Sequence, residues 1–119
     1  ISTIQGHPEL HDCTIDIPAD PSSAAFPAAA AALHPGSAIT LHAVGINERR
    51  IGFYTCLEEM GVDIVYKNDR VQAGEKVADI KILAPETLVA IDVPPERIPS
   101  MIDEFPVLFV LAACAKGTS

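Results

Sequence analysis

A repeated transition from helix to strand constrains the fold of this chain more than any other feature of its sequence. An Ala-rich apolar segment passes through Gly36 into a small hydroxyl residue, and a second segment does the same through Gly117. The two glycines are 81 positions apart. Self-similarity at a fixed period is typical of proteins built from repeated supersecondary units. We therefore predict one complete unit over about residues 12–92 and the start of the next over residues 93–119.

The first helix has clear boundary signals. Residues 20–23 read Asp-Pro-Ser-Ser, an Ala-rich run follows, and Pro35 comes just before the first of the two glycines. This is the pattern of an N-cap, a proline in the first helical turn and a stop. Pro27 lies inside the predicted helix, where a proline deletes a backbone hydrogen bond at a typical cost of about 3 kcal/mol. We therefore expect a kink or a late start.

Apolar periodicity and β-branched content predict the remaining elements, in the order β-β-α-β-α-β-β-β-α. The first two strands alternate apolar and polar residues around a polar turn, which predicts a hairpin. Prolines at positions 94, 95 and 99 exclude regular structure just before the last helix. Strands are expected at 2–5, 13–17, 39–46, 62–66, 77–83 and 88–91, helices at 48–60 and about 100–115, and turns at 67–69 and at Gly74.

The charge balance excludes nucleic acid as a partner. The chain has 8 Lys and Arg against 16 Asp and Glu, a formal net charge of −8, and its basic residues are scattered apart from Arg49 and Arg50. Proteins that bind nucleic acid carry a basic patch instead. The same balance repels phosphorylated or carboxylated metabolites. An enzyme acting on such substrates needs cationic groups from outside this segment.

Membrane insertion and a disulfide framework are also excluded. The longest apolar run, residues 105–115, is about half the length needed to span a bilayer. Three cysteines, far apart and without CxxC spacing, indicate a reducing, cytoplasmic compartment. His7, His11 and Cys13 lack a second ligand cluster, so we predict no metal site. The chain starts at Ile1 without a signal-peptide pattern, and we expect a cut N-terminus.

Three groups of acidic residues are candidates for function. Asp20 is expected to cap a helix, and its charge opposes phosphate binding at the same helix end. Glu58 and Glu59 point about 100° apart around a helix, which indicates a solvated edge rather than a shared proton. Asp103 and Glu104 stand in the first turn of an otherwise apolar predicted helix. There an acid either favours the helix dipole or accepts a proton from a substrate hydroxyl.

Four segments, in the same order, resemble the enolpyruvylshikimate-phosphate synthases, and together they extend over essentially the whole chain. The most specific one carries the stretch Ile-Asp-Glu-Phe-Pro that contains Asp103. The first segment is less specific, because Ala19 stands where the family usually has Gly and Pro27 also departs from the pattern. The four segments are residues 17–26, 44–47, 57–61 and 93–106.

This resemblance implies a fold and an activity. Members of the family transfer the enolpyruvyl group of phosphoenolpyruvate to the 5-hydroxyl of shikimate 3-phosphate and release phosphate, on the route to chorismate and the aromatic amino acids. They need no metal or organic cofactor. Each of their two domains is an inside-out α/β barrel of three βαβαββ units, with the site between the domains. Residues 1–119 would be a fragment of one domain, of the α/β (α+β) class. Asp103 matches the family's aspartate that contacts shikimate 3-phosphate and is assigned as the proton acceptor.

The resemblance also implies that the fragment is inactive alone, because the family's Lys-Ser and Arg positions that bind both substrates have no match here. Two alternatives stay open. One is the sister family that transfers enolpyruvyl to UDP-N-acetylglucosamine, whose sequence usually differs around Asp20 and Asp103. The other is an unrelated small α/β binding module, which would close its own hydrophobic faces. A cut repeat would instead self-associate through its apolar helix, and residues 105–114 predict such association.

Overall fold

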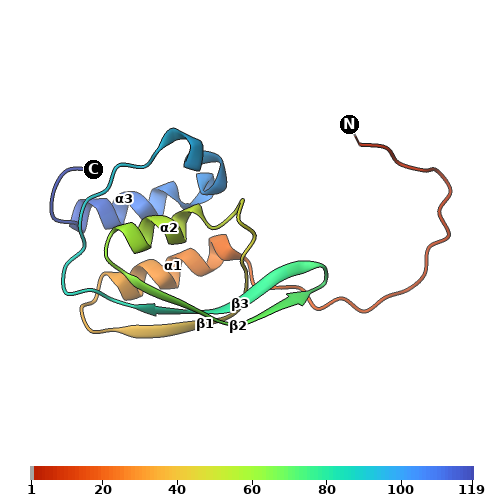
Figure 1. Cartoon of the computed structure of the whole chain (residues 1–119), viewed down its shortest axis with the longest axis horizontal. Helices are drawn as coiled ribbons and strands as arrows, with labels where there is room; N and C mark the ends of the chain where they lie inside the picture. Colours follow the sequence, from red (N-terminus) through yellow and green to blue (C-terminus); the bar gives the residue numbers. More distant parts are fainter. Residues whose placement is uncertain (1) are drawn as a thin grey trace.

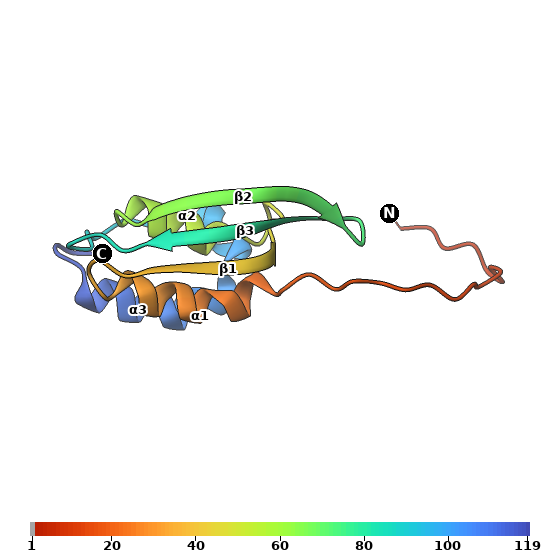
Figure 2. The same cartoon turned by 90° about the horizontal axis from the view of Figure 1, so that it is seen from below.

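The computed structural model describes residues 2–119, as an extended arm followed by an α+β core. Three helices cover one face of a three-stranded sheet (Figure 1), and the arm leaves the core at one end (Figure 2). Two short 3₁₀ helices, η1 and η2, precede the last helix. The elements in chain order are α1 (Pro21–Ala32), β1 (Ala38–Gly45), α2 (Gly52–Glu59), β2 (Asp63–Gln72), β3 (Glu75–Leu83), η1 (Pro95–Ser100), η2 (Ile102–Glu104) and α3 (Phe105–Cys114).

The last strand organises the sheet. β3 lies between β1 and β2 and pairs antiparallel with both, so β1 and β2 run in the same direction. Both strands stop at the same end of the sheet, where the β2–β3 hairpin also turns (Figure 1). Ile80 and Ile82 of β3 are fully buried in the core that the helices cover. Asp79 and Lys81 alternate with them and point to the opposite face, as the period of a strand requires.

The predicted first helix is confirmed and begins at Pro21 as expected. Small side chains on its inner face, such as the fully buried Ala25 and Ala28, let the helix approach its neighbours closely. The expected late start is wrong, because α1 continues without a break through Pro27. Pro27 lies on the exposed face of the helix. Water can therefore bind the backbone carbonyl that loses its partner.

The predicted N-terminal hairpin is wrong. Residues 2–18 form an extended arm without strand pairing. The side chain of Gln72 in β2 donates a hydrogen bond to the Asp16 carbonyl at 3.3 Å, and the first backbone pairing with the sheet is a single bridge between Ala19 and Val44. Apolar side chains along the arm, including Ile4 and Ile17, are exposed. A two-stranded hairpin is at best marginally stable in water unless a further strand or helix covers one of its faces. Within the described core nothing supplies that cover for this segment.

The predicted turn at residues 67–69 is a β-bulge, and β2 continues through it. A second bulge interrupts β1 directly across the central strand. Asp79 of β3 joins the two bulges: its Oδ1 accepts a hydrogen bond from the backbone N–H of Ala43 at 2.9 Å, and its Oδ2 accepts one from Asn68 Nδ2 at 2.8 Å. Ala43 and Asn68 both have a φ of 54°, in the left-handed region. These hydrogen bonds, the backbone one first, hold the pKa of Asp79 at about 2.

The C-terminal part also differs from expectation. The last helix begins at Phe105 rather than near residue 100, because the chain first makes the two 3₁₀ turns. The prolines expected to exclude regular structure are accommodated at the start of η1 and inside it, because the backbone donors that close this segment are Arg97, to Pro94 at 3.0 Å, and Met101, to Ile98 at 3.1 Å. The predicted strand at residues 88–91 is reduced to one bridge between Val89 and Lys116. The segment that it meets is the short stretch directly after α3.

Candidate functional site

Three helix N-termini gather at one end of the molecule. α1, α2 and α3 run in the same direction, and all begin at the end where β1 and β2 stop (Figure 1). A helix N-terminus presents unpaired backbone N–H groups and about half a positive elementary charge. Parallel helices therefore favour negative charge at this end, and at α1 the capping carboxylate of Asp20 already supplies it. We call it the helix N-terminal end, and the first residues of the three helices, Pro21, Gly52 and Phe105, define it.

Asp103, the residue singled out from the sequence, lies in η2 just before the start of α3. Its side chain is exposed, whereas its neighbours Met101 and Glu104 are only 1% and 5% exposed. The two adjacent acids thus have different surroundings, Asp103 in solvent and Glu104 in the core. An exposed carboxylate can accept the proton of a hydroxyl that comes within hydrogen-bonding reach.

Asp20 caps α1, which confirms the structural interpretation of this residue. Its Oδ2 accepts hydrogen bonds from Ser23, from the backbone N–H at 2.9 Å and from the hydroxyl at 2.8 Å. Arg50 donates to Asp20 Oδ1 at 2.8 Å and to Ser22 Oγ at 3.1 Å. The hydroxyl of Ser23, then its N–H, and further Arg50, lower the pKa of Asp20. In the sequence Arg50 is one of two adjacent basic residues, but its contact with Asp20 and Ser22 was not predicted.

Tyr54 links α2 to the start of α1. Its hydroxyl donates a hydrogen bond to the backbone carbonyl of Pro21 at 2.9 Å, and the side chain is buried. Burial, then the nearby Tyr66, Glu104 and Asp20, raises the pKa of Tyr54 well above its ordinary value. The hydroxyl therefore stays protonated and remains a donor at the helix N-terminal end.

Arg97 of η1 forms an ion pair with Glu59 that the sequence did not predict. Its Nη1 and Nη2 donate to Glu59 Oε2 and Oε1 at 2.6 and 2.7 Å. This bidentate ion pair joins η1 to the last residue of α2. The hydrogen bonds from Arg97 lower the pKa of Glu59. Glu59 was predicted as part of a solvated helix edge together with Glu58. Both residues are exposed, which agrees with that prediction, but the carboxylate of Glu59, whose side chain is 40% exposed, is also bound by Arg97.

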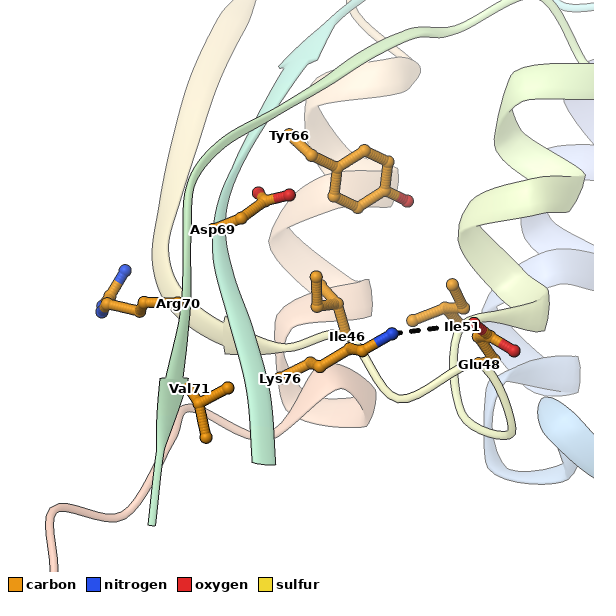
Figure 3. Close-up of a pocket in the computed structure, with 8 residues that line it drawn as sticks. All are labelled: Ile46, Glu48, Ile51, Tyr66, Asp69, Arg70, Val71 and Lys76. Carbon is orange, nitrogen blue, oxygen red and sulfur yellow. Dashed lines mark ion pairs between the residues drawn. The ribbon is translucent and has the colours of Figure 1, made fainter. Parts of the chain in front are cut away.

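An open groove of about 560 Å³ lies between the β2–β3 hairpin and the loop from β1 to α2 (Figure 3). Its apolar part comes from Ile46, Ile51 and Val71, and Tyr66 points into it. An ion pair between Lys76 Nζ and Glu48 Oε1, 3.9 Å apart, crosses its edge. Asp103 is not among the residues that line this groove.

Three possible metal ligands lie in the arm. His7, His11 and Cys13 lie along the extended arm and are exposed. Within residues 2–119, no three His, Cys, Asp or Glu side chains are placed so that they could hold a metal ion. None of the helices in the same range is long and apolar enough to cross a membrane.

A model of the EPSP synthase family, described as 3-phosphoshikimate 1-carboxyvinyltransferase, matches residues 1–119. The chain belongs to the EPSP synthase family. Two similar relatives are the 3-phosphoshikimate 1-carboxyvinyltransferases of Granulibacter bethesdensis, 55% identical over 119 residues, and of Rhodospirillum rubrum, 53% identical over 117 residues. These alignments cover 100% and 98% of this chain. The chain itself spans about a quarter of the length of these relatives, 26% in both cases.

A solved structure agrees with the family assignment. The EPSP synthase from Acinetobacter baumannii matches with a TM-score of 0.83 and 47% sequence identity, over 87% of this chain and 23% of that one. The likeness confirms the predicted fold class, an α+β piece of an EPSP synthase. The predicted resemblance is confirmed as well, and neither the sister transferase nor the unrelated binding module is supported by these matches.

Proposed function

We propose that this chain forms the part of an EPSP synthase that presents the proton acceptor, Asp103, to shikimate 3-phosphate. The complete enzyme transfers the enolpyruvyl group of phosphoenolpyruvate to the 5-hydroxyl of that substrate. The observation that carries the proposal is the exposed Asp103 carboxylate at the start of α3, in a chain matched over its whole length by the family.

The chemistry follows from this placement. The 5-hydroxyl oxygen bonds to the enolpyruvyl carbon that carries the phosphate, Asp103 takes the hydroxyl proton, and an acid from the rest of the enzyme adds a proton to the neighbouring methylene carbon, which becomes a methyl group. The carbon–oxygen bond to phosphate then breaks, the methyl group gives a proton back to that acid, the carbon–carbon double bond is restored and phosphate leaves. Such a positioned base contributes about 10²- to 10⁴-fold to the rate. No metal or organic cofactor takes part in this proposal.

The charge of the chain argues that it works only with the rest of a synthase. Both substrates are anions, and the formal net charge of −8 repels them, although the three helix N-termini favour negative charge locally. Cationic partners for phosphate and carboxylate therefore come from the three quarters of the relatives' length that this chain does not match. We propose that residues 12–92 are one βαβαββ unit and residues 93–119 begin the next. Alone, the chain is inactive.

We propose a cytoplasmic location, which the free state of Cys13, Cys56 and Cys114 supports. We further propose that the isolated chain pairs with a second copy through α1 and α3. Large apolar side chains stand exposed on these adjacent helices, Phe26 on α1 and Phe109 and Val110 on α3, with 60%, 64% and 52% exposure. Burying such a surface in a second copy removes it from water.

A chimeric enzyme tests the catalytic proposal. Residues 1–119 replace the matching segment of the Granulibacter bethesdensis synthase, to which they are 55% identical. We expect Asp103→Asn to lower kcat by about 10²- to 10⁴-fold, the range for loss of a general base. Asp92→Asn, a second exposed aspartate, serves as the control and should retain kcat. Equal activity of Asp103→Asn and the parent chimera would refute the role of Asp103.

Calorimetric titration tests the proposal that the chain is inactive alone. We expect no heat of binding when the isolated 119-residue chain is titrated with shikimate 3-phosphate, with or without phosphoenolpyruvate. Micromolar binding would instead show that this segment is a sufficient binding module. Light scattering on the same sample measures the mass of the particle, and a monomer mass would contradict the proposed pairing of two copies.

A further inference from the structure

Arg97 ties the segment before the candidate site to α2. Its two guanidinium nitrogens bind both oxygens of Glu59, at 2.6 and 2.7 Å, and its Nη1 also lies 3.4 Å from Cys56 Sγ. The Arg97 side chain is only 19% exposed, so the pair is partly shielded from water. A planar guanidinium that grips a carboxylate at two points fixes orientation as well as distance.

Close packing under η1 makes this contact rigid. A Cβ atom built on Gly52, the first residue of α2, would clash with the hydroxyl oxygen of Ser100. It would also lie 3.2 Å from Arg97 Cγ and 3.3 Å from Met101 Cβ. The chain therefore has a glycine where η1 presses on α2. The Ser100 hydroxyl also donates to the Arg97 carbonyl at 2.7 Å, which closes the turn on itself.

The packed turn continues directly into the candidate site. Met101 is 1% exposed, its backbone N–H donates to Ile98 at 3.1 Å, and its Sδ lies 3.6 Å from Cys56 Sγ. The backbone N–H of Glu104 then donates to the Met101 carbonyl at 3.1 Å. Ile102 and Asp103 are the two exposed residues between these buried ones. The Asp103 carboxylate is therefore placed by the backbone that Met101 and Glu104 anchor.

We propose that Arg97 is a positioning residue for Asp103: by clamping η1 to Glu59 on α2 it holds the Met101–Glu104 turn, and with it the carboxylate, at the helix N-terminal end. This inference rests on the proposed function of Asp103. Arg97 does not touch substrate in this proposal. It acts through Met101 and through the orientation of the turn.

The kinetic test uses the same chimeric synthase. We expect Arg97→Ala to lower kcat by about 10²-fold, the cost of a displacement of about 1 Å of a reacting group, with little change in KM for shikimate 3-phosphate. Arg97→Lys keeps the positive charge but not the bidentate contact, so its kcat should lie between those of Arg97→Ala and the parent chimera. The exchanged pair Arg97→Glu with Glu59→Arg restores the clamp and should recover kcat. Arg70→Ala, which removes an arginine paired with Asp79 at 3.8 Å, is the matched control.

Hydrogen exchange on the 119-residue chain supplies a second measurement that needs no activity. Arg97→Ala should speed the exchange of the Met101 and Glu104 amides at least tenfold and leave those of Ile80 and Ile82 unchanged. If Arg97→Ala does not fold, Arg97→Lys gives the same comparison at smaller amplitude.

The outcomes separate the two proposals. A strong loss of kcat in Asp103→Asn together with unchanged kcat in Arg97→Ala would overturn the positioning role and leave the proposed function standing. A rise in KM without a fall in kcat, or no recovery in the exchanged pair, would also overturn it. Unchanged kcat in Asp103→Asn would refute the proposed function and, with it, the inference about Arg97.

Discussion

The contact between Gly52 and η1 gives the sharpest stability prediction. In Gly52→Ala the new methyl group must displace the Ser100 hydroxyl and presses on Arg97 Cγ and Met101 Cβ at 3.2 and 3.3 Å. Overpacking of this kind costs about 1–3 kcal/mol. Replacing glycine by alanine returns about 0.5–1 kcal/mol in a helix interior and less at the first residue of a helix, where Gly52 lies. We expect the free energy of unfolding to fall by about 1–2 kcal/mol, which for a chain of this length lowers Tm by about 4–8 °C.

The assay is urea and thermal unfolding of the 119-residue chain followed by circular dichroism. Ser100→Ala removes the atom that meets the new methyl group, so the double variant should recover most of the loss, apart from the hydrogen bond from Ser100 to Arg97. Gly6→Ala is the control, because its Cβ would meet nothing within 4 Å. An unchanged Tm in Gly52→Ala would refute the packing argument. A double variant no more stable than Gly52→Ala would refute the assignment of the clash to Ser100.

Three further predictions concern hydrogen bonds, pH and association. Tyr54→Phe leaves the Pro21 carbonyl without its donor and should lower the free energy of unfolding by about 1–3 kcal/mol, more than Tyr66→Phe, in chemical denaturation. Folding lowers the pKa of Asp79 from its ordinary value of 3.8 to about 2, so the ionised carboxylate stabilises the folded chain fully at pH values above 3.8 and less as the pH falls toward 2. Tm should therefore fall as pH drops from 4 toward 2, less so in Asp79→Asn; a parallel fall in that variant would contradict this. Phe109→Ser should shift the isolated chain toward monomer in light scattering, whereas unchanged mass would exclude α3 from the contact.

Local signals predicted the parts of the fold that local chemistry controls. The cap at Asp20 and the proline that follows it start α1 where the sequence placed it, because a side chain three residues away can satisfy the free N–H groups of a helix. The sequence predicts a turn at residues 67–69 where the structure has a bulge, since the same polar residues suit both. The pairing of β2 with β3 on both sides of these residues, together with the hydrogen bond from Asn68 to Asp79, distinguishes the bulge from a turn.

The predicted hairpin in the N-terminal segment is wrong for a different reason. Alternation along residues 2–17 shows that a strand is possible, but a strand needs a partner and a covered face. Neither is encoded within the segment itself. The sequence does not predict the 3₁₀ turns before α3, because its three prolines oppose regular structure there, whereas a 3₁₀ turn tolerates them when other residues hold it in place.

The sequence by itself determined the family, the main helices and the acidic residue most suited to catalysis, because each of these depends on residue types at short, fixed spacings. The tertiary structure alone decided the surroundings of that residue. It brought Arg97 to Glu59 across 38 positions, buried Glu104 beside the exposed Asp103, and set three helix N-termini at one end. Such contacts join side chains far apart in the chain. They arise only when the helices pack on the sheet and exclude water between them.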